Sequence, residues 1–307
     1  MVTNAATRLR SFEISPSLFR TLAITSATAL WLIVVTGATV RLTSSGLGCE
    51  SWPGCQAGQP FPEKDFHSFI EFGNRLVGGI VIVATLITAI AAWRVLALPR
   101  WLAWTAVGVF AGTLAQAPLG YLTVRFGLNP YLVMSHFLLS AVVLGAAVVL
   151  ATGALGAERG TVPSPVPRGL RLAAVGAAAG CLILLVTGTV ATAAGPHPGD
   201  STKVHRLWRL QEAVFAHAVG TAIFGLCFAF MLGYLVSRRS SAPRLLWLAL
   251  GVLGLVGVQI LIGGIQYHTH LPWWLVLIHV ATAASVWVGV VALAALFQRP
   301  LAALVRT

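Results

Sequence analysis

Seven stretches that contain no Asp, Glu, Lys or Arg take up most of this 307-residue chain and limit what it can fold into. A helix needs about 20 mostly apolar residues to cross the hydrocarbon core of a bilayer, and most of the stretches reach or exceed that length. The last stretch is long enough for two helices, and Pro272 marks the expected break between them. The stretches are 21–40, 76–93, 101–124, 126–157, 172–199, 213–237 and 245–298.

The sequence therefore predicts an all-α membrane protein with eight transmembrane helices in contact with the lipid bilayer. Only 9% of the residues are charged, against roughly 25% in a soluble domain, so a soluble fold is excluded. The first stretch is too long for the apolar core of a signal peptide and is kept as a helix. The expected helices lie near 20–41, 69–93, 101–124, 131–154, 168–192, 211–236, 244–265 and 273–297.

A net charge of +12 at pH 7 suggests nucleic-acid binding at first, but the distribution of the charge indicates membrane topology instead. With the helices above, the two termini and the even-numbered loops carry 13 Lys and Arg residues but only two acids, Glu13 and Glu158. The opposite side carries seven basic and six acidic residues. The positive-inside rule then places both termini in the cytoplasm and the chain in the inner, cytoplasmic membrane, with no nucleic-acid partner.

The second half of the chain repeats the polar pattern of the first. In each half a Gln is followed by a Gly four residues later and by a His sixteen residues after the Gly, and a Thr-Gly pair stands near the end of the first helix. These residues are Thr36, Gly37, Gln116, Gly120 and His136, then Thr187, Gly188, Gln259, Gly263 and His279.

Each half has four expected helices, so both halves enter the membrane from the same side and form a parallel repeat. We expect two tandem four-helix bundles, 1–157 and 168–307. The proline-rich segment 155–168 is expected to be a flexible linker between them.

Three histidines, His136, His217 and His279, lie about two turns inside the external ends of their expected helices. A lone His in a packed helix is more often a hydrogen-bonded core residue. Three at matching depth, two of them related by the repeat, favour metal ligands. Bis-imidazole ligation of haem iron between facing helices fits the pattern. Zinc fits less well, because no thiolate or carboxylate accompanies His217 or His279 at that depth.

The first half has further polar residues at the outer end of its second helix. His67, Glu71 and Asn74 follow at i, i+4 and i+7, so they share one helix face, and Arg75 is placed to pair with Glu71. A polar helix entrance at the membrane surface is the alternative interpretation. Cys49 and Cys55 lie six positions apart in the preceding external loop, in an oxidising compartment, and we predict a reversible disulfide between them. A purely structural staple is the alternative.

Three segments together resemble the haem A synthase family in its bacterial, actinobacterial-like form. They are TGATVRLTSSGLGC at 36–49, WPGC at 52–55 and IEFGNR at 70–75. The resemblance covers nearly the whole chain. It implies an oxidoreductase that oxidises a methyl substituent of haem O to a formyl group by successive hydroxylation, which yields haem A for a terminal oxidase.

The resemblance also implies the cofactor, the sites and the partners. A haem b would be ligated in the C-terminal half by His217 and His279, and the substrate haem would lie in the N-terminal half beside Glu71 and His136, with Glu71 as the catalytic residue. Haem O synthase and terminal oxidase assembly are the implied partners, and a homo-oligomer is left open.

One residue departs from the family pattern, in which most members have His at the position of Asn74. Asn is a poor iron ligand, so Asn74 is expected to line the site without binding iron. His67 replaces it only if the haem lies about 10 Å farther out. Otherwise His136 alone holds the substrate haem. Two other functions compete with the synthase, a dihaem b-type electron-transfer cytochrome and a transporter whose histidines bind substrate or protons.

Overall fold

A computed structural model describes residues 13–56, 58, 61–62, 65–96, 98–161, 166–200, 206–237, 239–240 and 243–299. The described part contains eight helices and no strands, and every helix is long and apolar enough to cross a membrane. The all-α prediction is confirmed, and the chain is a multi-pass membrane protein. The helices are α2 (Pro16–Leu42), α3 (Phe66–Ala92), α4 (Arg100–Arg125), α5 (Pro130–Arg159), α6 (Arg168–Ala194), α7 (Leu210–Ser237), α8 (Pro243–His268) and α9 (Trp273–Gln298).

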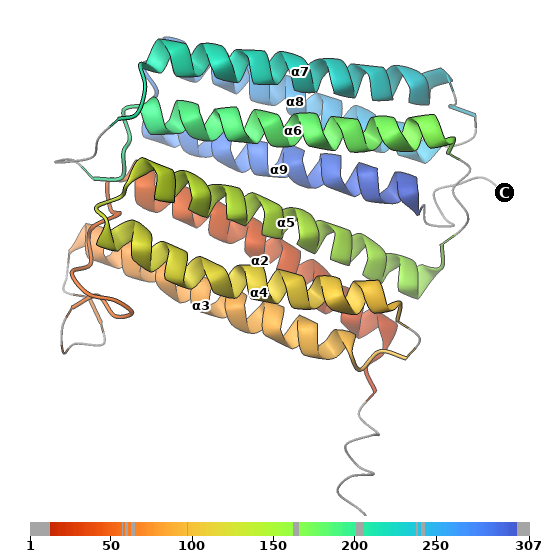
Figure 1. Cartoon of the computed structure of the whole chain (residues 1–307), viewed down its shortest axis with the longest axis horizontal. Coiled ribbons are helices and arrows are strands. Elements are labelled where there is room, and N and C mark those ends of the chain that lie inside the picture. The colour runs from red at the N-terminus through yellow and green to blue at the C-terminus, as the bar shows by residue number, and fades with distance from the viewer. Residues whose placement is uncertain are drawn as a thin grey trace, which may run out of the picture.

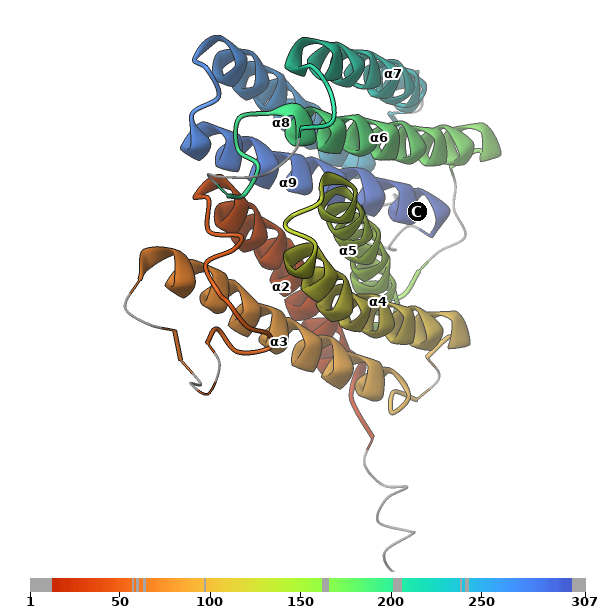
Figure 2. The same cartoon turned by 60° about the vertical axis from the view of Figure 1, so that its left-hand side comes forward.

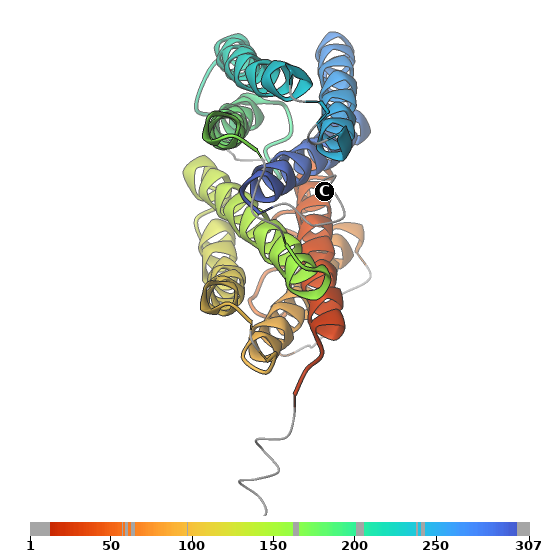
Figure 3. The ribbon, with the colours of Figure 1, turned by 90° about the vertical axis from the view of Figure 1, so that its right-hand side faces the viewer.

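The helices form two groups of four that lie side by side with their long axes roughly aligned (Figure 1). In the first group, α2 contacts α3 and α5, and α4 contacts the same two helices, so the four close into a ring. In the second group, α9 contacts α6 and α8, and α6 contacts α7, whereas α7 and α8 touch only slightly. An end-on view shows the two groups stacked, with α5 and α9 at their boundary (Figure 3).

The two groups are joined mainly through α9, which contacts both α2 and α5 (Figure 2). Two tryptophans fix this boundary. The indole N–H of Trp287 in α9 donates to the carbonyl of Ala141 in α5 at 2.8 Å, and that of Trp31 in α2 donates to Ser285 in α9 at 3.2 Å. Buried Trp N–H groups need such acceptors, so these bonds favour one register between the groups.

The groups also meet at the end of the bundle that carries Cys49 and Cys55, which we call the disulfide end. The N–H of Gly46, just after α2, donates to the carbonyl of Gly199, just after α6, at 2.9 Å. The guanidinium of Arg41 reaches across from α2 to the carbonyl of Thr192 in α6, with an N–O distance of 2.5 Å. The repeated ends of α2 and α6 are therefore tied together.

Several helices begin where a polar cap is followed by proline or an apolar run. Ser15 caps α2 by accepting from the N–H of Leu18, and Asn129 caps α5 by accepting from Tyr131. A proline is the first residue of both helices, where its missing N–H costs nothing. α5 begins within one residue of its expected start, whereas α2 begins four residues before the expected start, at Pro16.

The expected linker 155–168 was wrong over its first part, because α5 continues to Arg159. The side chain of Glu158 lies against α2, where its carboxylate pairs with Arg20 at 2.6 Å. This ion pair gives the extra helical turn a reason to form. Gly160 ends the helix with φ of 78°, a backbone conformation that favours glycine. Residues 162–165 of the expected linker, including Pro163 and Pro165, lie outside the described residues.

Candidate functional site

Two imidazoles face each other between helices of the second group. The ring centroids of His217 in α7 and His279 in α9 are 6.5 Å apart, and the ring planes are inclined by 71°. Imidazoles that bind one metal ion from opposite sides, each at a metal–nitrogen distance of about 2 Å, have their centroids about 6–6.5 Å apart. The pair that the sequence predicted therefore fits a single iron held between two histidines.

The surroundings of His217 leave one ring nitrogen for such a metal. The hydroxyl of Thr187 in α6 is 3.3 Å from Nδ1 of His217. A Cβ on Gly188 would stand 3.2 Å from Cε1 and 3.5 Å from Nδ1 of the same ring. One edge of the imidazole thus lies against α6, which leaves Nε2 as the nitrogen for a metal.

His279 is held by the Gln and Gly of the repeated pattern. The side-chain amide of Gln259 in α8 donates to the backbone carbonyl of His279 at 3.0 Å. One turn further along α8, a Cβ on Gly263 would come within 3.1 Å of Cε1 of the imidazole. The Gln therefore fixes the helix that carries the histidine, and the Gly provides space for its ring.

The first group repeats this arrangement around His136 of α5. The amide of Gln116 in α4 donates to the carbonyl of His136 at 3.2 Å and to the hydroxyl of Ser140 at 2.8 Å. A Cβ on Gly120 would lie 3.5 Å from Cε1 of His136. The spacing of Gln, Gly and His in the sequence therefore corresponds to one local structure that occurs twice.

Both copies contain buried polar atoms without a hydrogen-bond partner among the described residues. They are Nδ1 of His136 and His279 and Oε1 of Gln116 and Gln259. Leaving a buried donor or acceptor unpaired costs about 1–3 kcal/mol. Its recurrence at related positions in both groups marks these positions as candidate ligand sites, because ordinary core packing would not repeat such a cost.

Asn74 and His67, which share one face of α3, contact different parts of the structure. Asn74 faces α2, where the hydroxyl of Thr36 donates to its Oδ1 at 2.8 Å. His67 is exposed at the disulfide end, with Nδ1 2.9 Å from the hydroxyl of Ser45 and its ring edge-on to Phe66. The structure thus directs Asn74 toward the helices of the first group and keeps His67 at the surface.

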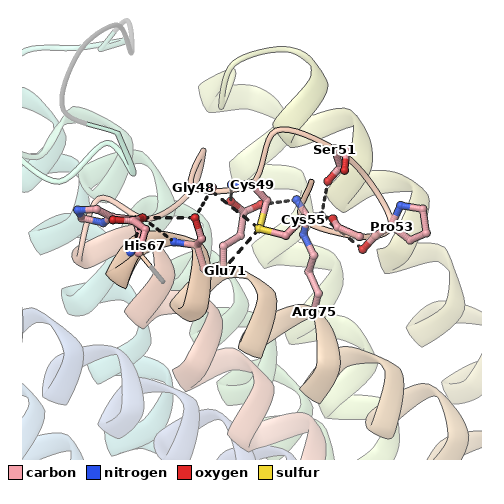
Figure 4. Close-up of a disulfide and its surroundings, with 11 residues drawn as sticks. Gly48, Cys49, Ser51, Pro53, Cys55, His67, Glu71 and Arg75 are labelled. Carbon is pink, nitrogen blue, oxygen red and sulfur yellow. Dashed lines mark hydrogen bonds and ion pairs between the residues drawn. A yellow bond between two sulfur atoms is a disulfide. The ribbon is translucent and has the colours of Figure 1, made fainter. Parts of the chain in front are cut away.

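Glu71, between them, is a buried carboxylate with both oxygens engaged (Figure 4). Oε1 pairs with the guanidinium of Arg75 at 2.5 Å, and Oε2 accepts from the backbone N–H of Cys49 at 2.8 Å. Arg75 also donates to the carbonyls of Ser51 and Gly54 in the loop. The pair of Glu71 and Arg75 therefore fastens residues 48–55 of the loop between α2 and α3, which we call the disulfide loop, onto α3.

The predicted disulfide between Cys49 and Cys55 is confirmed, and both cysteines, which belong to the loop, are buried (Figure 4). The loop lies directly on the first turn of α3. The hydroxyl of Ser68 donates to the carbonyl of Gly48 at 2.7 Å, and a Cβ on Gly48 would come within 2.6 Å of the backbone of His67. Glycine is therefore required at position 48. Whether the disulfide is reversible stays a prediction.

The same turn begins with Asp65, which caps α3. Its carboxylate accepts from the backbone N–H groups of His67 and Ser68 at 3.0 and 3.1 Å. The hydrogen bond from Ser68 is the main reason why the pKa of Asp65 lies below its ordinary value. This cap positions the turn on which the disulfide loop rests.

The sequence did not predict three contacts of the site. The repeated Thr-Gly pair was noticed, but not that Thr36 and Thr187 contact side chains of the next helix. Aligning the second helices of the two halves places Asn74 at the position of His217, and this is the sequence signal that could have indicated these contacts. The bond from Cys49 to Glu71 had no sequence signal, since it depends on the path of the loop.

The two groups differ in chemistry despite the repeat. A separation of 143 residues relates His136 to His279, and the same separation carries Glu71 to Val214 and Arg75 to Ala218. The carboxylate, its guanidinium partner and the disulfide loop therefore belong to the first group alone. The second group offers a pair of histidines in an apolar setting, which suits a held metal group more than a reacting one.

The chain is similar to a family of known proteins and to several of its named members. A model of the cytochrome oxidase assembly protein family matches residues 20–65 and 58–291. A protein named heme A synthase from Bacillus pumilus is 31% identical over 134 residues, which are 43% of this chain and 43% of the relative. A heme A synthase from Geobacillus thermodenitrificans is 33% identical over 130 residues, 42% of this chain and 41% of the relative.

A third relative, a protoheme IX farnesyltransferase from Thermus thermophilus, is 30% identical over 296 residues. That match covers 86% of this chain and 46% of the relative. The chain thus spans less than half the length of each of these relatives in the matched regions. The family model covers nearly all of the eight helices, from α2 to α9. The chain therefore belongs to the cytochrome oxidase assembly protein family.

Proposed function

We propose that this protein is a haem A synthase, an oxidoreductase that oxidises a methyl substituent of haem O to the formyl group of haem A. Membership of the family and the two relatives named heme A synthase support this function. The observation that carries it is the facing pair of His217 and His279, together with a chemically different second site in the other group. One site to hold a resident haem and one to hold a haem substrate is what this reaction needs.

His217 and His279 are proposed to hold the resident haem b. Their centroid distance suits one iron, and the contact of Thr187 with Nδ1 of His217 would hold that ring in place. A haem iron with two axial histidines supplies one-electron chemistry when bound. The protein's own task there is to fix both rings and to keep water out, which the apolar helices α7 and α9 are suited to do.

His136 is proposed to hold the substrate haem in the first group. Gln116 fixes the backbone of this residue and Gly120 leaves space beside its ring, as their counterparts do for His279. The reacting methyl group would be oriented by its attachment to a ring held in this way, and the disulfide loop would cover it. Two successive hydroxylations of that methyl group would give a geminal diol, which loses water to become the formyl group. In each hydroxylation the carbon would give up two electrons to an external acceptor and gain the oxygen of a water molecule, with two protons released.

Glu71 is proposed as the acidic residue of this reaction. In the structure its two oxygens are held by Arg75 and by the N–H of Cys49. A carboxylate in this place can stabilise positive charge that develops on a nearby carbon, or accept a proton once one of these contacts opens. Because it also fastens the disulfide loop, Glu71 would couple the chemistry to the position of that loop.

The proposed partners follow from the substrate and the product. Haem O is a farnesylated haem, so an enzyme that farnesylates haem must supply it. The relative named protoheme IX farnesyltransferase matches this chain with less than half of its length, which supports a close link between the two steps. A terminal oxidase would take up the product. We also propose a location in the cytoplasmic membrane with both termini in the cytoplasm, because the basic residues gather on that side.

The function is tested by co-expressing the full chain with a haem O synthase in a host that makes no haem A. Extracted pigments are separated by chromatography, and the expected result is haem A in the membrane. A membrane that contains the folded protein, with a b-type spectrum, but only haem B and haem O would overturn the proposal. That outcome would favour the alternative of a dihaem electron-transfer cytochrome, which the family and the relatives named above do not support.

A further inference from the structure

The position of Asn74 in the first group corresponds to that of His217 in the second. The two residues are 143 positions apart, the separation that also relates Gln116 to Gln259 and His136 to His279. The side chain of each is contacted by the Thr of the repeated Thr-Gly pair on the neighbouring helix. Thr36 is 2.8 Å from Oδ1 of Asn74, and Thr187 is 3.3 Å from Nδ1 of His217.

The glycines of the two pairs agree with this correspondence. A Cβ on Gly37 would lie 4.0 Å from Oδ1 of Asn74, and one on Gly188 would lie 3.2 Å from Cε1 of His217. The first helix of each group therefore presents the same Thr and Gly to the same position of the next helix. In one group that position holds an imidazole, and in the other it holds an amide.

An amide at this position is a poor second axial ligand for haem iron. Its nitrogen has no lone pair free for a metal, and its oxygen is a weak donor with one lone pair already accepting the hydroxyl of Thr36. The side chain is also a bond shorter than the path from Cβ to Nε2 of a histidine. What Asn74 still offers is the pair of N–H donors on Nδ2, which can bind a small molecule on the iron.

The nearby polar residues of α3 are not placed to take over the role. His67 lies two turns from Asn74 at the exposed end of α3 and bonds Ser45, and the corresponding position of α7 holds Leu210. Glu71 lies one turn away with both oxygens engaged. In the second group the residue at this position, His217, faces the ring of His279, so by the repeat Asn74 is the residue of α3 that corresponds to the partner of His136.

We propose that the haem site of the first group has one axial protein ligand, His136, and an open face beside Asn74 that binds a small exogenous ligand. The second group would have no such face, because His217 fills the corresponding position. This inference rests on the proposed function only in that a haem occupies the first group. It assigns different tasks to the two halves of the repeat. A haem with two axial protein ligands, which we call closed, transfers electrons, whereas a haem with one free axial position, which we call open, binds small molecules.

The test is carbon monoxide binding to the purified full-length protein, with haem B supplied so that both sites are filled. Reduced wild-type protein should bind about one carbon monoxide for two haems, and the oxidised protein should show one high-spin and one low-spin haem by electron paramagnetic resonance. Asn74→His should abolish carbon monoxide binding and make both haems low-spin. Asn74→Ala, which also lacks a ligand, should keep the wild-type stoichiometry.

The converse variant uses the symmetry of the repeat as a control. His217→Asn should open the second site, so that carbon monoxide binds there as well. Two low-spin haems and no carbon monoxide binding in the wild type would overturn the inference. So would binding that persists unchanged in Asn74→His, a first group that takes up no haem when haem is supplied, or a His217→Asn haem that stays closed.

The synthase proposal and this inference fail separately. Haem A production with two closed haems would leave the function intact and remove the open face. The predicted carbon monoxide pattern without any haem A would keep the open face and remove the proposed reaction.

Discussion

Oε2 of Glu71 accepts a hydrogen bond of 2.8 Å from the backbone N–H of Cys49, so the buried acid of α3 is joined directly to the disulfide loop. The other oxygen pairs with Arg75, whose guanidinium also bonds loop carbonyls. A single network thus links the Glu71 carboxylate, the Arg75 guanidinium and the two cysteines (Figure 4). The position of the loop and the charge of the acid depend on each other.

Replacing Arg75 by Ala should loosen the disulfide loop more than replacing Glu71 by Gln. Removing one partner of a buried ion pair costs about 3–5 kcal/mol, whereas Gln keeps the shape and some hydrogen bonds of Glu. We expect faster hydrogen exchange at the backbone amide of Cys49 in both variants, with the larger change in Arg75→Ala. Glu71→Gln should keep its haem but stop formyl production, with some alcohol intermediate. Normal haem A yields from Glu71→Gln would show that its charge is not needed.

Replacing either His217 or His279 by Ala should remove the low-spin haem b signal, because one axial ligand is lost from the second group. Visible and electron paramagnetic resonance spectra of the purified variants measure it. His136→Ala is the matched control, since it should remove haem from the first group and leave the low-spin signal of the second. A full b-type spectrum in both His217→Ala and His279→Ala would contradict the assignment.

Gly263→Ala should disturb the resident haem, whereas Gly257→Ala on the same helix should not. A Cβ at position 263 would stand 3.1 Å from the ring of His279, so the ring must shift, but a Cβ at 257 meets no atom within 4 Å. Both variants gain about 1 kcal/mol of helix propensity, which therefore cancels in the comparison. We expect about 10-fold faster haem loss in Gly263→Ala, in the range for a disturbed outer contact of a metal ligand. Equal rates in the two variants would argue against a ligand role for His279.

Thiol counting tests the disulfide and its reversibility. The chain has four cysteines, of which Cys49 and Cys55 are bonded and Cys181 and Cys227 are free. Denatured protein should therefore react with two equivalents of a thiol reagent without reductant and with four after reduction. Four reactive thiols without reductant would refute the bond. Full haem A production by the Cys49→Ser/Cys55→Ser double variant would remove a redox role and leave a structural staple.

The first turn of α3 should depend on pH through Asp65. Its pKa is lowered in the folded protein, mainly by the hydrogen bond from Ser68, so its contribution to stability is present above the ordinary pKa of an Asp. That contribution is lost as the pH falls through the lowered value. Amide exchange at His67 and Ser68, corrected for its intrinsic pH dependence, should rise in acid in the wild type. Asp65→Ala should show the fast rate at all pH values, and Asp65→Asn, which can still cap, should show little pH dependence.

The sequence determined the spans and the main candidate ligands. Apolar length is a local property, since a bilayer core requires about 20 apolar residues whatever the neighbours are, and the eight helices accordingly appear close to their expected ends. The repeat placed His136 and His279 in related positions for the same reason, because spacing along a helix fixes the side from which a residue projects. The sequence did not indicate the extra turn of α5, because the pairing of Glu158 with Arg20 joins two helices that lie far apart in the sequence.

Only the tertiary structure decided what the polar residues contact. The separation of 143 residues relates Asn74 to His217 in the sequence, but only the structure shows that both side chains contact a threonine of the neighbouring helix. The contact of Glu71 with the N–H of Cys49 also appears only in the structure. Loops have no periodicity from which their path can be read, and contacts between helices depend on how the helices rotate and pack against one another. The distance between His217 and His279 is set in the same way, by the packing of α7 and α9 within the second group, and no spacing along the chain contains it.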